Sequence, residues 1–132
     1  MEKMNDNELL ELLKIGDVKG FNEYRKENPK QKIDFEGENF DGINLEWINL
    51  KEANLRNCTF LGANMACSNL RNANLENVNF EGAILQNANL WGSYFEGADF
   101  EGANLFGLTV HSDGIEMLID CIGIVVKDGW IP

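Results

Sequence analysis

The chain has 132 residues, 22 of them acidic and 11 basic, with a formal net charge of -11 and a pI near 4.4. This length allows one compact core. The charge disfavours nucleic acid and anionic membrane surfaces, because both are bound mainly through Lys and Arg. No apolar run reaches the roughly 18 residues of a membrane span. Residues 1–7 are polar and carry no signal-peptide pattern, so we expect a cytoplasmic protein.

Residues 1–32 are predicted to form a helical N-terminal cap. Asn5 and Glu8 have the spacing of a capping box, in which each side chain bonds to the backbone of the other. Two amphipathic segments follow, separated by Gly16 and Asp17 and ended by Pro29. Their apolar residues are Leu9, Leu10, Leu12 and Leu13 in the first segment and Val18, Phe21 and Tyr24 in the second.

Residues 33–107 carry an unbroken five-residue repeat. A Phe, Leu or Met stands at every fifth position from Phe35 to Leu105, and the residue two before it is small or apolar everywhere except at Glu38. The residue just before the large one is mostly Asn, and the residue two after it is mostly Gly or Asn. A period of five fits neither a helix nor a strand, so we expect a turn in every pentad.

If four such pentads close one coil, both apolar positions point inward and residues twenty apart stack. Successive coils then lie about 4.8 Å apart, and the fifteen pentads make a column of nearly four coils, about 18 Å tall. The ends of so short a solenoid need caps.

These residues resemble the pentapeptide-repeat proteins, whose consensus is A-(D/N)-(L/F)-x-x. The best matches are Ala53-Asn-Leu-Arg-Asn, Ala73-Asn-Leu-Glu-Asn, Ala98-Asp-Phe-Glu-Gly and Ala103-Asn-Leu-Phe-Gly. The resemblance implies a mainly β fold, a right-handed quadrilateral parallel β-helix with a helical N-terminal cap and a short C-terminal helix and strand. Met65, Ile84 and Tyr94 depart from the consensus, the last two by adding apolar surface.

Residues 108–132 are predicted to close the other end. Ser112 or Asp113 can cap a helix that carries Ile115, Met117, Leu118, Ile119 and Ile122, followed by a strand over residues 123–126 and a turn over 127–129. In this family the C-terminal end often forms a dimer interface. We therefore expect a homodimer through residues 115–131, the alternative being a monomer with a well-packed lid. The expected dimer contacts are Ile115, Leu118, Ile119, Ile122, Val125 and Trp130.

The twenty-residue stacking also predicts what each outer face displays. The residues that follow the large apolar positions form four columns: Glu36, Arg56, Glu76 and Glu96; Asp41, Leu61, Glu81 and Glu101; Glu46, Ala66, Gln86 and Phe106; and Lys51, Arg71 and Trp91. The first two columns predict an acidic interaction face of Glu36, Asp41, Glu76, Glu81, Glu96 and Glu101. The fourth predicts a basic and aromatic strip. The simpler interpretation of the acids is that they keep the solenoid soluble.

We expect no catalytic residues, no cofactor and no metal site. The interior of so narrow a β-helix is filled, and the spacing of Cys58, Cys67, Cys121 and His111 fits neither a zinc site nor a redox pair. Cys58 falls at an inward position, whereas Cys67 falls at an outward turn.

The sequence is compatible with three functions. The first is a non-catalytic protein-interaction scaffold with an unidentified protein partner, bound through faces that expose Trp47, Trp91, Tyr94 and Phe106. The second is an acidic DNA mimic that binds a DNA-handling enzyme such as a type II topoisomerase, as some pentapeptide-repeat proteins do; two columns end to end span only about 36 Å, which argues against it. The third is an enzyme with a site between the caps and the coils, tested by substituting Cys121 and His111.

Overall fold

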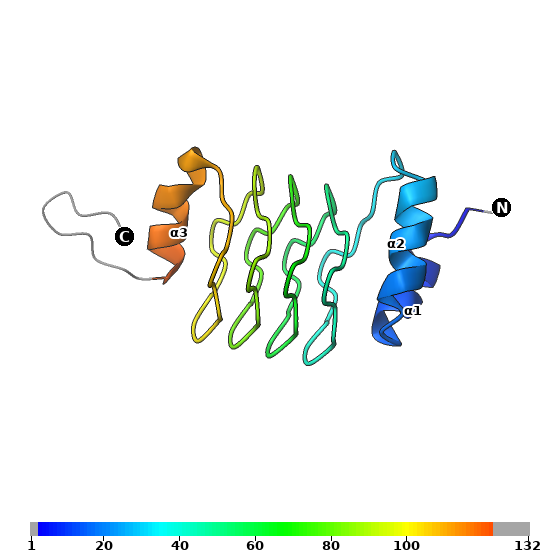
Figure 1. The fold of residues 1–132 in the computed structure, drawn as a ribbon, viewed down its shortest axis with the longest axis horizontal. Helices are drawn as coiled ribbons and strands as arrows, with labels where there is room; N and C mark the ends of the chain where they lie inside the picture. The colour runs from blue at the N-terminus through cyan, green and yellow to red at the C-terminus, as the bar shows by residue number, and fades with distance from the viewer. Residues whose placement is uncertain (1–2, 123–132) are drawn as a thin grey trace, which may run out of the picture.

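The computed structural model describes residues 3–122, which form a column of stacked coils between helices at its two ends (Figure 1). Helices α1 (Asp6–Lys14) and α2 (Val18–Glu27) lie at the N-terminal end, and α3 (Ile115–Ile122) lies at the C-terminal end. Among the described residues, no helix has the length and apolar character needed to cross a membrane.

The coils pair as the repeat predicts, with residues twenty apart in register. Parallel bridges run from Asp34 with Asn54 through to Asn89 with Thr109. These are isolated bridges and not continuous strands, because each pentad turns before a strand can extend. The pairing reaches Thr109, past the predicted end of the repeat at residue 107, since Leu108 and Val110 continue the apolar pattern.

Every pentad turns at a residue with positive φ, two positions after the large apolar residue. Gly and Asn hold most of these positions, as expected from their tolerance of left-handed backbone, but Trp47 at φ 68° also adopts this conformation. The recurrent Asn has a structural role that the sequence pattern did not reveal. Its Oδ1 accepts the backbone N–H of the residue two positions further on; for example, Asn89 Oδ1 accepts the Trp91 N–H at 2.9 Å.

Both inward positions fill the interior of the column. The large apolar residues from Phe35 to Phe100 are all buried, and Leu105, in the last coil, is half-buried. On one side the rings of Phe40, Phe60, Phe80 and Phe100 stack with centroids 5.0 to 5.3 Å apart. Glu38, the exception in the repeat, is half-buried in the first coil.

Helices α1 and α2 cover the first coil with an apolar surface. The predicted capping box is present, with Asn5 Oδ1 accepting the Glu8 N–H at 2.9 Å and Glu8 Oε1 accepting the Asn5 N–H at 3.3 Å. Leu9, Leu13 and Phe21 are fully buried, and the Phe21 ring lies 6.3 Å from that of Phe35.

The same helices satisfy backbone groups of the first coil that have no preceding coil to pair with. Lys14 Nζ donates to the Asn39 carbonyl at 2.8 Å. The Asn22 amide donates to the Trp47 carbonyl at 3.0 Å and accepts the Asn49 N–H at 2.8 Å. Unpaired strand edges invite association, so these side chains take the place of a missing coil.

The C-terminal end begins with a 3₁₀ turn over Ser112–Gly114, which leads into α3. Met117, Leu118, Cys121 and Ile122 pack against the core. Neither Ser112 nor Asp113 accepts a backbone N–H through its side chain in the described residues, so the predicted cap of α3 is not observed. The capping side chain at this end is that of His111, whose Nδ1 accepts the Asp113 N–H at 3.1 Å and caps the 3₁₀ turn. The strand predicted over 123–126 and the turn over 127–129 lie outside the described residues.

Candidate interaction surfaces

The column presents four faces, each built from one pentad of every coil. The first face holds residues 35–39, 55–59, 75–79 and 95–99; the second holds 40–44, 60–64, 80–84 and 100–104; the third holds 45–49, 65–69, 85–89 and 105–109; the fourth holds 50–54, 70–74, 90–94 and 110–113. The first two faces carry eight acids and one base, Arg56. The third face carries one acid, Glu46, and the fourth balances Lys51 and Arg71 against Glu52 and Asp113.

The acids of the first face are partly neutralised. Arg56 Nε lies 2.6 Å from Glu76 Oε1, and Arg56 Nη1 lies 4.0 Å from Glu36 Oε1. The hydrogen bond to Glu76 raises the pKa of Arg56. The Tyr94 hydroxyl donates to Glu96, and this bond, followed by desolvation, raises the pKa of Tyr94. Arg56 therefore sits in the middle of the predicted acidic column, and the column is not a continuous row of free carboxylates.

On the second face, the Asp41 carboxylate accepts a hydrogen bond from the backbone of the next coil. Its Oδ1 accepts the Leu61 N–H at 2.8 Å, in place of Thr59, whose hydroxyl has no partner among the described residues. The carboxylates of Glu81 and Glu101 lie within 4.8 Å of each other and of Asp99. Of the six predicted acidic-face residues, these two form no hydrogen bond or ion pair through their carboxylates with the described part of the chain.

The fourth face carries an ordered column of basic and aromatic side chains, which we call the strip: Lys51, Arg71, Trp91 and His111. The Arg71 guanidinium lies 5.1 Å from the centroid of the Trp91 ring, and the Trp91 and His111 rings meet edge to face at 5.1 Å. Such contacts fix side chains on a surface where they would otherwise be mobile.

The backbone beneath the strip is fixed as well. Asn49, Asn69 and Asn89 accept the N–H groups of Lys51, Arg71 and Trp91 at 3.2, 3.1 and 2.9 Å. Neither Lys51 nor Arg71 forms an ion pair with a described residue. His111 was not predicted to belong to the strip. The signal was available, since it lies twenty residues after Trp91.

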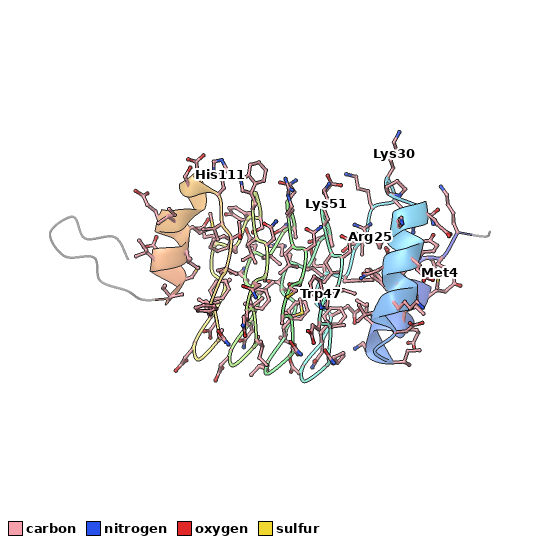
Figure 2. All side chains as sticks on the ribbon, in the orientation of Figure 1. Met4, Arg25, Lys30, Trp47, Lys51 and His111 are labelled. Atoms are coloured by element: carbon pink, nitrogen blue, oxygen red, sulfur yellow. The ribbon has the colours of Figure 1, made fainter. Side chains whose placement is uncertain are left out.

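Two hollows flank the strip. One lies between α2 and the first coil and is lined by Asn22, Arg25, Lys26, Pro29, Asn49, Lys51 and Glu52. The other lies beside α3 and is lined by Asn72, Leu90, Trp91, Gly92, Ser93, His111, Asp113, Gly114 and Met117. Figure 2 shows Lys51 and His111 along one edge of the column, with Lys30 at the same edge beyond the first coil.

Large aromatic side chains are exposed on the same half of the molecule. Trp47 is 65% exposed and Phe106 74% exposed, both on the third face, and Trp91 is 40% exposed on the fourth. Tyr94 and Ile84 are also exposed, as their outward positions predict.

The residues predicted to form a dimer contact divide into two groups. Ile115 is exposed, and Leu118, Ile119 and Ile122 are half-buried on α3, where Leu118 and Ile122 pack against the core. Val125 and Trp130 lie outside the described residues. Two of the predicted contacts therefore contribute to the lid of the column.

The three cysteines differ in their burial, and Cys58 is buried as its inward position predicts. Cys58 is buried and donates to the Phe35 carbonyl at 2.9 Å, and burial raises the pKa of its thiol to about 12. Cys121 Sγ lies 3.4 Å from the Phe95 carbonyl, and desolvation raises its pKa too. Cys67 is half-buried at a left-handed turn. Deprotonation of the Cys58 and Cys121 thiols is disfavoured, so these two cysteines are poor nucleophiles.

Comparison with known proteins agrees with this architecture. Residues 33–110 match the family model described as pentapeptide repeat region, and the chain belongs to the pentapeptide-repeat family. No curated protein matches the chain.

Three solved structures illustrate the likeness. QnrB1, described as a plasmid-mediated fluoroquinolone resistance protein, is 24% identical with a TM-score of 0.59, over 72% of this chain and 46% of QnrB1. The pentapeptide-repeat protein alr5209 of Nostoc PCC 7120 is 24% identical, TM-score 0.43, over 59% of this chain and 76% of that one. Rfr23 of Cyanothece 51142 is 29% identical, TM-score 0.35, over 62% and 61%. The chain thus matches less than half of the length of QnrB1, and the likeness shows a shared fold.

Proposed function

We propose that this protein is a non-catalytic interaction scaffold that binds a protein partner through its third and fourth faces. The supporting observation is the segregation of its surface: acids gather on the first and second faces, while the strip, Trp47 and Phe106 gather on the other two. Exposed aromatic side chains and Arg are the usual anchors of protein interfaces. A rigid solenoid presents them in fixed register at little cost in ordering.

A capture experiment with three forms of the chain tests this proposal. The forms are the wild type, an acidic-face variant with Glu36, Asp41, Glu76, Glu81, Glu96 and Glu101 changed to Gln or Asn, and a third-and-fourth-face variant with Trp47→Asn, Arg71→Gln, Trp91→Ala and Phe106→Gln. We expect a partner that the wild type and the acidic-face variant both retain and the other variant loses. A partner retained equally by all three forms contradicts the proposal.

DNA mimicry is the second candidate, favoured by the carboxylates of Glu81, Asp99 and Glu101, which lie within 4.8 Å of one another. The similarity to QnrB1 is too low in identity to transfer an activity. Two interactions argue against mimicry. Arg56 neutralises part of the acidic face by pairing with Glu36 and Glu76, and the Asp41 carboxylate is hydrogen-bonded to the Leu61 backbone. Capture of a DNA-handling enzyme by the wild type, lost only with the acidic-face variant, would make mimicry the better hypothesis.

Homodimerisation through α3 and the residues that follow is also a proposal. Partial exposure of Ile115 and Ile119 on the end of the column supports it. Sedimentation equilibrium of the wild type and of Ile115→Lys tests it. We expect a dimer that the substitution dissociates, and a monomeric wild type contradicts the idea.

A further inference from the structure

We propose that the strip binds an extended acidic segment of a partner protein, with carboxylates over Lys51 and Arg71 and an apolar side chain in the hollow beside Trp91. This inference rests on the proposed scaffold function and specifies the chemistry of the partner.

The charge of the strip selects an anionic ligand. Lys51 and Arg71 are exposed, occupy stacked positions about one coil spacing (roughly 4.8 Å) apart, and pair with no carboxylate in the described residues. Lys26 extends the positive surface into the hollow at α2. The acids on this face are Glu52 and Asp113, one near each end, and Asp34, which is paired in register with Asn54 of the same face. Complementary charge gives specificity and speeds encounter.

The length of the strip suits a short extended peptide. From Lys51 to Trp91 there are two coil spacings, about 9.6 Å, which an extended chain at roughly 3.3 Å per residue covers in three residues. Successive side chains of an extended segment point to opposite sides, so only alternate residues, about 6.6 Å apart, face the column. Two acidic residues two positions apart can therefore reach Lys51 and Arg71, because the long side chains span the difference from the coil spacing of roughly 4.8 Å. An apolar residue two positions further on then faces Trp91.

The hollow beside α3 gives the segment a direction. Its wall contains Leu90, Trp91 and Met117, which suit an apolar side chain, while Asp113 at the same hollow disfavours a carboxylate. The acidic end of the ligand is therefore directed toward α2 and the apolar end toward α3.

A nucleic acid strand fits this surface less well. A strand that continued along the column beyond the two cations would bring a phosphate toward Asp113, which lines the same hollow as Trp91. Only a short anionic segment avoids this repulsion.

The test is fluorescence anisotropy with a labelled synthetic peptide of four Glu followed by Phe and Leu, at low and high salt. We expect saturable, salt-sensitive binding to the full chain. Lys51→Glu with Arg71→Glu should weaken it at least tenfold. The control is Lys3→Glu with Lys19→Glu, which changes the net charge equally at exposed sites that line neither hollow beside the strip. Circular dichroism checks that all variants remain folded.

Two further comparisons test the assignment of the ends. Trp91→Ala should weaken binding of the Phe-containing peptide and leave a peptide of Glu and Ala alone unaffected. The inference is overturned if the peptide does not bind, if the strip and control variants weaken binding equally, or if a twelve-residue oligothymidylate binds more tightly than the peptide.

The outcome is separable from the fate of the proposed function. If the peptide fails to bind but the capture experiment still yields a partner lost with the third-and-fourth-face variant, the scaffold function stands and the acidic ligand is wrong. If capture also fails, both are wrong.

Discussion

The guanidinium of Arg25 donates to the backbone carbonyl of Lys51, so a buried cation of α2 holds the first residue of the strip. A second guanidinium nitrogen donates to the Gln31 carbonyl at 3.1 Å. Burial lowers the pKa of Arg25, and the neighbouring Glu52 opposes that shift. The N-terminal helices are thus joined to the coils by polar contacts as well as by apolar packing.

Replacing Arg25 by Met should lower the free energy of unfolding by about 2–3 kcal/mol, because the Gln31 and Lys51 carbonyls, in part-buried contacts, lose a charged donor. The control is Lys26→Met, the exposed neighbour in α2, which should change stability by less than about 0.5 kcal/mol. Urea denaturation measures both. Equal stability of the Arg25 variant and the wild type would show that the bond is dispensable.

Ser68→Ala should stabilise the protein by about 1 kcal/mol. Ser68 is 1% exposed at an inward position, and its hydroxyl has no partner among the described residues. Ser93 is the matched control at another inward position, because its hydroxyl donates to the Leu90 carbonyl at 2.7 Å. Ser93→Ala should therefore not stabilise. Thermal unfolding that ranked the two substitutions the other way would contradict this reasoning.

Trp47→Asn should raise the free energy of unfolding by roughly 0.5–1 kcal/mol, since Asn tolerates the left-handed backbone better than Trp does. The side chain is 65% exposed, so little packing is lost. Trp91→Asn, where φ is not positive, should bring no such gain. If Trp47→Asn destabilises the fold in chemical denaturation, the indole contributes more packing than its exposure indicates.

Cys58 should make stability fall at alkaline pH. Its pKa is raised from 9.0 to about 12 in the folded state, so the unfolded chain loses this proton first as the pH rises. Stability linked to the thiol is complete below about pH 9 and is lost between pH 9 and 12, by about 2 kcal/mol at pH 10.5. Denaturation at pH 7 and 10.5 should show a smaller loss for Cys58→Ala than for the wild type. Identical losses would mean that other groups cause the whole effect.

Much of the fold was accessible from sequence because a solenoid makes every coil solve the same packing problem. The five-residue spacing of Phe, Leu and Met placed the core from Phe35 onward, and the twenty-residue step placed Lys51, Arg71 and Trp91 on one face. The capping box at Asn5 and Glu8 was predictable for the same reason, since its bonds are local.

Two kinds of contact could not be predicted from the repeat: those between the N-terminal helices and the first coil, and those between outward side chains and their partners. The bonds of Lys14, Asn22 and Arg25 to the first coil depend on how α1 and α2 dock, which no local pattern encodes. The ion pair of Arg56 with Glu76 and the hydrogen bond from the Leu61 N–H to Asp41 Oδ1 depend on side-chain rotamers.

The sequence by itself therefore determined the column, its inward residues and the membership of each face, because these follow from chain periodicity and the burial of apolar side chains. The tertiary structure decided which charged side chains form ion pairs or hydrogen bonds. Stacking brought Arg56 between two glutamates and left Lys51 and Arg71 without a carboxylate partner among residues 3–122. It also placed His111 against Trp91 at the end of the strip. Electrostatic character depends on distances of a few ångströms, which only the folded chain sets.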